Sequence, residues 1–145
     1  MKIKFTQKLW GYLKPDYKPS DALLKSFGET GVRDVKLNFT TSGRNINNTW
    51  KPLEKSTKAQ RRKSSDKDKP LMDTTLLFGS ISKWVRSGSS LITTNRIGEH
   101  GENVAYDMNY GVKRRHVPAR EFMLFSQDAI EEMIYHQKKE AESGS

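Results

Sequence analysis

The longest regular apolar pattern in the chain lies near its N-terminus and predicts a long helix. Apolar or small residues recur there at three- and four-residue steps, as one face of an α-helix requires: Leu24, Phe27, Gly31, Val35 and Phe39. Ser20 suits the N-cap, and Asp21 suits the first turn. Gly28 and Gly31 each weaken such a helix by about 1 kcal/mol relative to alanine. We therefore expect a helix over residues 20–39 that has either a kink or a packed partner.

A second helix is predicted near the C-terminal end of the sequence. Ser126 suits its N-cap, acidic residues occupy its first turns, and Lys138 and Lys139 lie near its end. One face carries most of its apolar residues: Ile130, Met133, Ile134 and Gln137, with Ala129 beside them. Residues 140–145 are expected to fray.

The middle of the chain predicts a β-hairpin and further short strands. Residues 80–86 and 91–95 are rich in β-branched and aromatic side chains and flank a glycine-containing loop. Weak alternation over residues 1–10 suggests a short strand, and residues 121–125 are expected to form a last strand. Together with the two long helices, these elements predict an α+β fold: a small antiparallel sheet flanked by an N-terminal helix and a C-terminal helix, with long loops.

Helical and loop segments complete the expected single domain of residues 1–145. A helix is predicted over residues 54–63, and one helical turn from Asp73 or Thr74 to Phe78. Residues 104–110 suit a helix or a strand. Residues 40–48 and 64–70 are polar and are expected to be loops.

The composition fits a component of an assembly better than a compact enzyme. Of the 145 residues, 34% are hydrophobic and 30% are charged. Counting glycine brings the apolar share to about 41%, below the usual ~45–50% of globular domains. The absence of cysteine excludes disulfides, thiolate metal sites and a cysteine nucleophile. No stretch is apolar enough for a signal peptide or a membrane span, so we expect a protein that does not cross a membrane.

Charge is unevenly distributed along the chain. The net charge is +9, and residues 51–69 hold eight basic and three acidic residues. From Ser126 onward there are five acidic and two basic residues. This asymmetry suggests pairing between neighbouring copies or a nearby polyanion, with a solvated loop and a solvated helix face as the alternative. We also expect residues 55–69 to be disordered in the free monomer and to become ordered on assembly.

The sequence contains no convincing catalytic or metal site. His100, His116 and His136 are scattered, and His100 lies in a loop with Glu99 and Glu102 that is more simply explained as solvent-exposed. A phosphate-binding glycine motif and a nucleophile elbow are both absent. We therefore expect no enzyme, no catalytic residue, no metal and no cofactor, because a small hydrolase would need a clustered polar pocket.

Nucleic-acid binding is the alternative that the basic segment suggests. Basic residues at three- and four-residue steps would line one face of the helix expected at 54–63: Lys55, Lys58, Arg61 and Arg62, with Lys63 next to them. Aromatic residues are not interleaved with this row, so stacking on single strands is poorly supported. The alternative function is therefore a small, basic nucleic-acid-binding regulatory protein, and the other interpretation of the row is a solubilising or salt-bridging surface.

One ordered set of short motifs is more specific than composition. The set runs through Trp50-Lys51-Pro52-Leu53, Thr57, Arg61, Pro70-Leu71-Met72-Asp73-Thr74 with Leu76, Ala105-Tyr106, Tyr110-Gly111 and Val117-Pro118-Ala119-Arg120-Glu121-Phe122. In order and spacing it resembles the virion morphogenesis (tail completion) family of Mu-like phages, over about residues 49–133. Thr75 stands where that family usually has glycine, and the order of the alanine and tyrosine at 105–106 is reversed.

The resemblance implies a structural virion protein at the neck, or head-proximal tail end, of a tailed phage, made in the host cytoplasm. It implies a ring of copies, a homohexamer or a dodecamer, around the channel through which double-stranded DNA passes non-specifically. The implied partners are the head connector or stopper and the tail tube or sheath proteins, with no membrane. Tail terminators share part of the pattern, so a terminator role is equally compatible.

The motif residues divide into expected core and expected interface positions. The family-motif and core candidates are Trp50, Leu53, Thr57, Leu71, Asp73, Leu76, Tyr106, Gly111, Pro118, Ala119 and Phe122. The candidates for a subunit interface or a DNA channel are Lys55, Lys58, Arg61, Arg62, Lys63, Arg114, Arg115 and Arg120. Arg120 is singled out because a guanidinium fork suits a carboxylate at a subunit interface; an ion pair within the chain is the alternative.

Overall fold

The computed structural model describes residues 2–4, 19–60, 70–71, 76–86, 88–98 and 100–143. Its helices and strands, in chain order, are β1 (Lys2–Lys4), α1 (Asp21–Thr40), the 3₁₀ helix η2 (Arg44–Ile46), α2 (Lys55–Gln60), α3 (Leu76–Gly79), β2 (Ser82–Arg86), β3 (Ser89–Thr93), α4 (Val104–Tyr110), the 3₁₀ helix η3 (Lys113–Arg115) and α5 (Gln127–Ser143).

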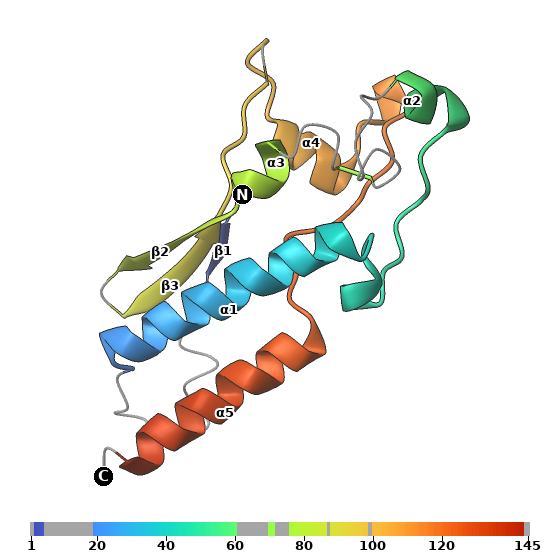
Figure 1. The fold of residues 1–145 in the computed structure, drawn as a ribbon. Coiled ribbons are helices and arrows are strands. Elements are labelled where there is room, and N and C mark those ends of the chain that lie inside the picture. The colour runs from blue at the N-terminus through green and yellow to red at the C-terminus, as the bar shows by residue number, and fades with distance from the viewer. Residues whose placement is uncertain are drawn as a thin grey trace.

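The sheet is small and antiparallel, with the strand order β1-β3-β2. The predicted hairpin is confirmed: β2 pairs with β3 from Ser82↔Thr93 to Arg86↔Ser89. The strand expected within residues 1–10 forms at Lys2–Lys4 and pairs with β3, while residues 5–10 lie outside the described part. Figure 1 shows α1 running between the sheet and α5, so both long helices lie on the same side of the sheet. The α+β fold class is confirmed.

Helix α1 forms where the stripe predicts it, and its packed partner is the sheet. The Ser20 hydroxyl accepts a hydrogen bond from the Leu23 amide at 3.1 Å, as expected of the N-cap. A Cβ on Gly31 would lie 2.8 Å from the Ile92 side chain, and one on Gly28 would lie 3.0 Å from Ser90 Oγ. The two glycines therefore lower the helix propensity but allow β3 to pack directly on the helix backbone.

The core lies where α1, the loop after it and the segment before α5 meet. Phe39 is fully buried at the end of α1. Its ring centroid lies 5.9 Å from that of Trp50 and 5.7 Å from that of Phe78, both edge-on. It also lies 5.0 Å from the ring of Phe122, which is fully buried as well. Such aromatic pairs contribute about 0.5–1.5 kcal/mol beyond their buried area.

The segment just before α5 is not the strand that the sequence predicts. Its backbone is hydrogen-bonded by buried side chains instead of a neighbouring strand. Asn38 Nδ2 donates to the carbonyl oxygens of Phe122 at 2.8 Å and Leu124 at 2.9 Å. From the other side, Asn109 Oδ1 accepts from the amides of Phe122 at 2.9 Å and Met123 at 3.1 Å. These two asparagines meet the need of a buried backbone for partners, which a sheet would otherwise supply.

Asp34 extends this network to the start of α5. Its carboxylate accepts from the Ser126 amide at 2.7 Å and from the Ser126 hydroxyl at 2.6 Å. The same hydroxyl accepts from the Ala129 amide at 3.2 Å, so Ser126 is the predicted N-cap and is itself held by α1. Asn45 donates to both Asp34 and Asn38, each at 2.9 Å. We call Asp34, Asn38 and Asn109, all buried, the polar clamp.

Helix α5 packs antiparallel to α1 and extends to Ser143. Its buried stripe is Ala129, Met133 and Gln137. Glu132 pairs with Arg33 of α1 at 2.6 Å. Near its end, Glu140 accepts hydrogen bonds from the Ser20 amide and hydroxyl at the start of α1. Residues 140–143 are helical, and this contact holds them to α1. That residues 140–145 fray stays a prediction, and residues 144–145 lie outside the described part.

The shorter elements follow the predictions in part. Within 54–63 the helix forms at Lys55–Gln60. The expectation that residues 55–69 are disordered in the free monomer stays a prediction. The one-turn helix is found at Leu76–Gly79, and residues 104–110 form a helix, not a strand. The loop at 40–48 contains a single turn of 3₁₀ helix. Residues 61–69 and 72–75, which include most of the loop expected at 64–70, lie outside the described part.

Replacing Asn38 by alanine should destabilise the fold strongly. The change removes both donors to the 122–124 backbone and leaves buried carbonyl oxygens without these partners. We expect the free energy of unfolding to fall by about 2–4 kcal/mol, measured by urea denaturation. As a control, Asn95→Ala changes an exposed asparagine and should shift it by less than about 0.5 kcal/mol. Equal effects of the two substitutions would contradict the role of the clamp.

Candidate functional site

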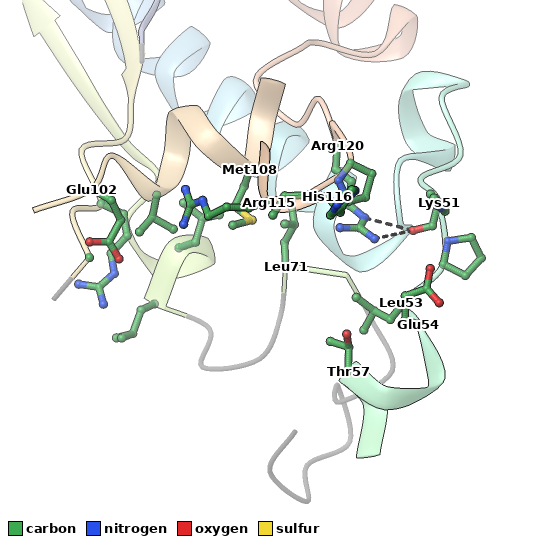
Figure 2. A pocket seen from close by; sticks show the side chains of 18 residues that line it. Lys51, Leu53, Glu54, Thr57, Leu71, Glu102, Met108, Arg115, His116 and Arg120 are labelled. Carbon is green, nitrogen blue, oxygen red and sulfur yellow. Dashed lines mark hydrogen bonds between the residues drawn. The ribbon is translucent and has the colours of Figure 1, made fainter. Parts of the chain in front are cut away.

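A pocket of about 570 Å³ is lined by residues of α2, α3 and α4 and of the segments around them. Four segments far apart in the sequence line it: the chain leading into α2, the region around α3, the loop before α4 with α4 itself, and the segment after η3. Figure 2 shows Leu53 and Thr57 facing Leu71 and Met108 across this space. No single element builds the pocket, so it exists only in the folded chain.

The lining combines an apolar surface with several cations. Its apolar part includes Leu53, Leu71, Leu76, Leu77, Val104, Met108 and Val117. Its basic part consists of Lys51, Arg96, Arg115 and Arg120, with His116 beside them, and its acids are Glu54 and Glu102. Basic groups therefore outnumber acidic ones, which favours an anionic or carboxylate-bearing ligand over a cationic one.

Arg120 connects three of the segments that line the pocket: its own, the chain before α2, and α4. Its guanidinium Nε and Nη2 donate to the Lys51 carbonyl oxygen at 3.1 and 2.9 Å, as drawn in Figure 2. Its own amide donates to the carbonyl oxygen of Met108 on α4 at 3.0 Å. Only 6% of the residue is exposed. The expectation of a surface interface residue is therefore corrected: Arg120 is internal, because its fork holds the chain that leads into α2.

Helix α4 presents three different faces. Val104 and Met108 line the pocket, while Ala105 and Asn109 are buried in the core. The third face carries Tyr106 and Tyr110, each 54% exposed, with ring centroids 4.7 Å apart; we call these two residues the tyrosine pair. Tyr106, a family-motif and core candidate, is not in the core, because the helix turns by about 100° per residue and so carries this side chain away from the face of Ala105 and Asn109.

A tight turn follows α4 and carries consecutive cations. Val112 and Val117 exchange two backbone hydrogen bonds, 2.9 and 3.1 Å, that close the turn. Residues 113–116, which we call the basic turn, are Lys113, Arg114, Arg115 and His116, and all four are exposed. Arg115 also forms an ion pair with Asp107 of α4 at 2.8 Å. The turn is thereby held against the helix.

Gly111 allows the chain after the basic turn to pass close to the end of α4. Its φ of +77° lies in the left-handed region, and a Cβ there would lie 2.7 Å from the Ala119 amide nitrogen and 2.8 Å from the Val117 oxygen. Gly111 therefore meets a backbone requirement, and a side chain at this position would push the basic turn away from α4.

The loop before α4 does not bring His100 into a metal site. Glu102 accepts a hydrogen bond from the His100 amide at 2.9 Å. Hydrogen bonds from backbone amides, first its own and then that of His100, lower the pKa of the Glu102 carboxyl group. His100 is exposed, and Glu99 lies outside the described part. Among the described residues, no three His, Asp or Glu side chains are placed to hold a metal ion.

The remaining predicted residues fall into separate places. Trp50 and Phe122 are in the core, and Trp50 Nε1 donates to the Glu121 oxygen at 3.2 Å. Leu53 and Leu76, also expected in the core, are corrected to the pocket, since Leu53 is half-buried and Leu76 is 51% exposed. Thr57, Leu71 and Pro118 line the same pocket.

The predicted interface residues are only partly visible. Ala119, a family-motif and core candidate, is exposed, so its expected core position is wrong. Among the interface candidates, Arg114 is exposed, and α2 carries Lys55 and Lys58. Arg61, Arg62, Lys63 and Asp73 lie outside the described residues. Sequence reasoning missed Arg96 and Met108 in the pocket and all three residues of the polar clamp. Isolated polar residues within helices carry no pattern that marks them as buried.

Comparisons with known proteins identify no relative: no family model matches the chain, and no curated protein or solved structure matches it. Within the described ranges, the helices are all too short or too polar to cross a membrane.

Substituting Gly111 by alanine should destabilise the α4–η3 junction. The left-handed φ and the backbone contacts below 3 Å both oppose a Cβ. We expect a loss of about 2 kcal/mol or more in the free energy of unfolding, from urea titration. Gly79→Ala is the matched control, because a Cβ on Gly79 meets nothing within 4 Å. It should be neutral or slightly stabilising, and a similar loss at both glycines would contradict the assigned role of Gly111.

Proposed function

We propose that this protein is a structural subunit of a tailed phage virion, a neck or tail completion protein that forms a ring. In this role it caps the tail and joins it to the head connector by surface contacts, without catalysis. The resemblance of residues 49–133 to the tail completion family is the basis of the phage assignment. The observation that supports it best is the pocket, because it gathers motif residues that the sequence separates.

Positions from four of the motif segments meet around this pocket: Leu53, Thr57, Leu71, Leu76, Pro118 and Arg120. Trp50 and Phe122, from the first and last of these segments, meet the same core residue, Phe39. A shared motif set that surrounds one apolar and basic recess suits a docking position for a neighbouring protein. Apolar centres with polar rims are typical of such interfaces.

The exposed edge of the sheet offers a second contact surface. Trp84 on β2 is 58% exposed, and the Arg86 guanidinium lies 4.6 Å from its ring centroid. Tryptophan and arginine are enriched among the residues that dominate binding energy at interfaces. Exposed carboxylates on α5 at Asp128 and Glu131 add an acidic surface that a neighbouring copy's cations can approach. Two unlike surfaces of this kind suit head-to-tail association, which forms a ring where the rotation between neighbouring subunits closes.

The proposal is tested by measuring the mass of the purified chain by light scattering, alone and with isolated phage tails, followed by negative-stain imaging. We expect a hexameric or dodecameric ring, or additional density at one end of the tail. A monomer that leaves the tails unchanged would overturn the proposal.

Replacing Trp84 by serine should weaken association without unfolding the chain. The side chain is mostly exposed, so its removal costs little within the monomer but deletes apolar contact area between copies. We expect the ring to dissociate at concentrations where the unsubstituted chain is assembled, measured by sedimentation velocity. Circular dichroism and thermal unfolding should match those of the unsubstituted chain. Unchanged assembly would remove β2 from the interface.

A further inference from the structure

We propose that the basic turn and the tyrosine pair form one surface that binds the phosphate backbone of duplex DNA. This deepens the proposed function, since it assigns the face of the subunit that meets DNA, but the binding itself is a property of the free chain.

The cations of the basic turn are carried on a backbone that is closed by hydrogen bonds. The basic turn is closed by both hydrogen bonds between Val112 and Val117, and two further amides bond within it, Arg115 to Val112 at 3.1 Å and His116 to Lys113 at 3.1 Å. Gly111 sets it against α4. Positive charges on a short, closed turn lose less conformational freedom on binding than charges on an open loop.

Two of the cations on the basic turn are available to a ligand. Arg115 is engaged with Asp107 at 2.8 Å. Lys113 and Arg114 are exposed, and neither forms an ion pair with any residue that the structure describes. Two adjacent cations that pair with no acidic side chain among the described residues, held beside a third, are suited to phosphates that follow one another along a strand.

The tyrosine pair lies on the part of α4 to which the basic turn is attached. Asp107 follows Tyr106 on α4 and lies between the tyrosine face and the pocket face, so its ion pair with Arg115 brings the basic turn to the side of both. Tyrosine hydroxyl groups donate hydrogen bonds to phosphate oxygens in protein–DNA complexes. The tyrosine pair therefore adds two half-exposed hydroxyl donors to the cations of the basic turn.

Further basic residues lie beyond the turn, in the lining of the pocket. Arg115 and His116 also line the pocket, which contains Lys51 and Arg96 as well. The same lining also holds Glu54 and Glu102, whereas the acidic first turns of α5 belong to a different layer of the molecule (Figure 1). Basic groups outnumber acidic ones around the turn and the pocket together, and several separate cations suit the successive phosphates of a duplex backbone better than a single carboxylate.

The experiment measures the binding of the full chain to a fluorescein-labelled 30-base-pair duplex by anisotropy, from 50 to 200 mM NaCl. The test variant is Lys113→Glu with Arg114→Glu, and the matched control is Lys25→Glu with Lys138→Glu, which changes the net charge equally at exposed positions of α1 and α5. We expect the test variant to bind at least about tenfold more weakly at 50 mM NaCl, with a salt slope lower by about 2. The control should lose less than about threefold.

A second variant tests the tyrosines. Tyr106→Phe with Tyr110→Phe keeps both rings and removes only the hydroxyl groups, so a loss of affinity of about threefold or more is expected, and unchanged affinity would overturn the assignment of the tyrosine pair. Thermal unfolding must be the same for all variants. The proposal as a whole is overturned if the unsubstituted chain does not bind the duplex at 50 mM NaCl, if both charge variants lose affinity equally, or if poly-glutamate competes as well per charge as unlabelled duplex.

These outcomes are separable from those of the assembly test. Ring formation is measured without DNA, and DNA binding is measured on the free chain. A ring that does not bind the duplex would overturn this inference and leave the proposed function standing. A monomer that binds the duplex but ignores tails would do the reverse and favour a nucleic-acid-binding regulator.

Discussion

The fold depends on the way three polar side chains, Asp34, Asn38 and Asn109, hold the irregular segment before α5. Buried backbone amides and carbonyls need partners, and this segment has no neighbouring strand to provide them. The clamp supplies these bonds from two different helices, and Asp34 at the same time holds the N-cap of α5. Without these contacts, α5 would have no defined starting point on α1, and the Phe122 side chain would not be fixed against Phe39.

The clamp also positions the pocket. Asn109 lies on α4, whose neighbouring positions, Val104 and Met108, line the recess. Arg120 begins the clamped segment and holds the Lys51 carbonyl, so the chain leading into α2 is attached to the same framework. The pocket is thus a secondary consequence of how the core is closed. A substitution in the polar clamp should therefore change the shape of the pocket, since both depend on α4 and the 120–126 segment.

The proposed contacts all use what the core leaves exposed. Helix α4 illustrates this: one turn of helix places alanine in the core, methionine in the pocket and tyrosine in solvent. With so small a hydrophobic share, the chain closes a modest core, and several large apolar side chains stay at the surface. This arrangement suits a protein whose final stability is reached on association, in which partners cover surfaces that the isolated chain exposes.

The sequence alone determined those parts of the structure that depend on residues close together in the chain. The two long helices, their N-caps at Ser20 and Ser126, and the β2–β3 hairpin follow from periodicity, capping chemistry and turn residues within a few positions, and the fold class follows from their order. The tertiary structure decided the rest. Tyr106 and Leu76 look like core residues in the sequence but face outward, and the strand expected at 121–125 is an irregular segment. Burial and the choice of hydrogen-bond partner depend on which segments meet across the fold: the Tyr106 face of α4 and Leu76 are left uncovered, and Asn38 and Asn109 take the place of a neighbouring strand at the 122–124 backbone.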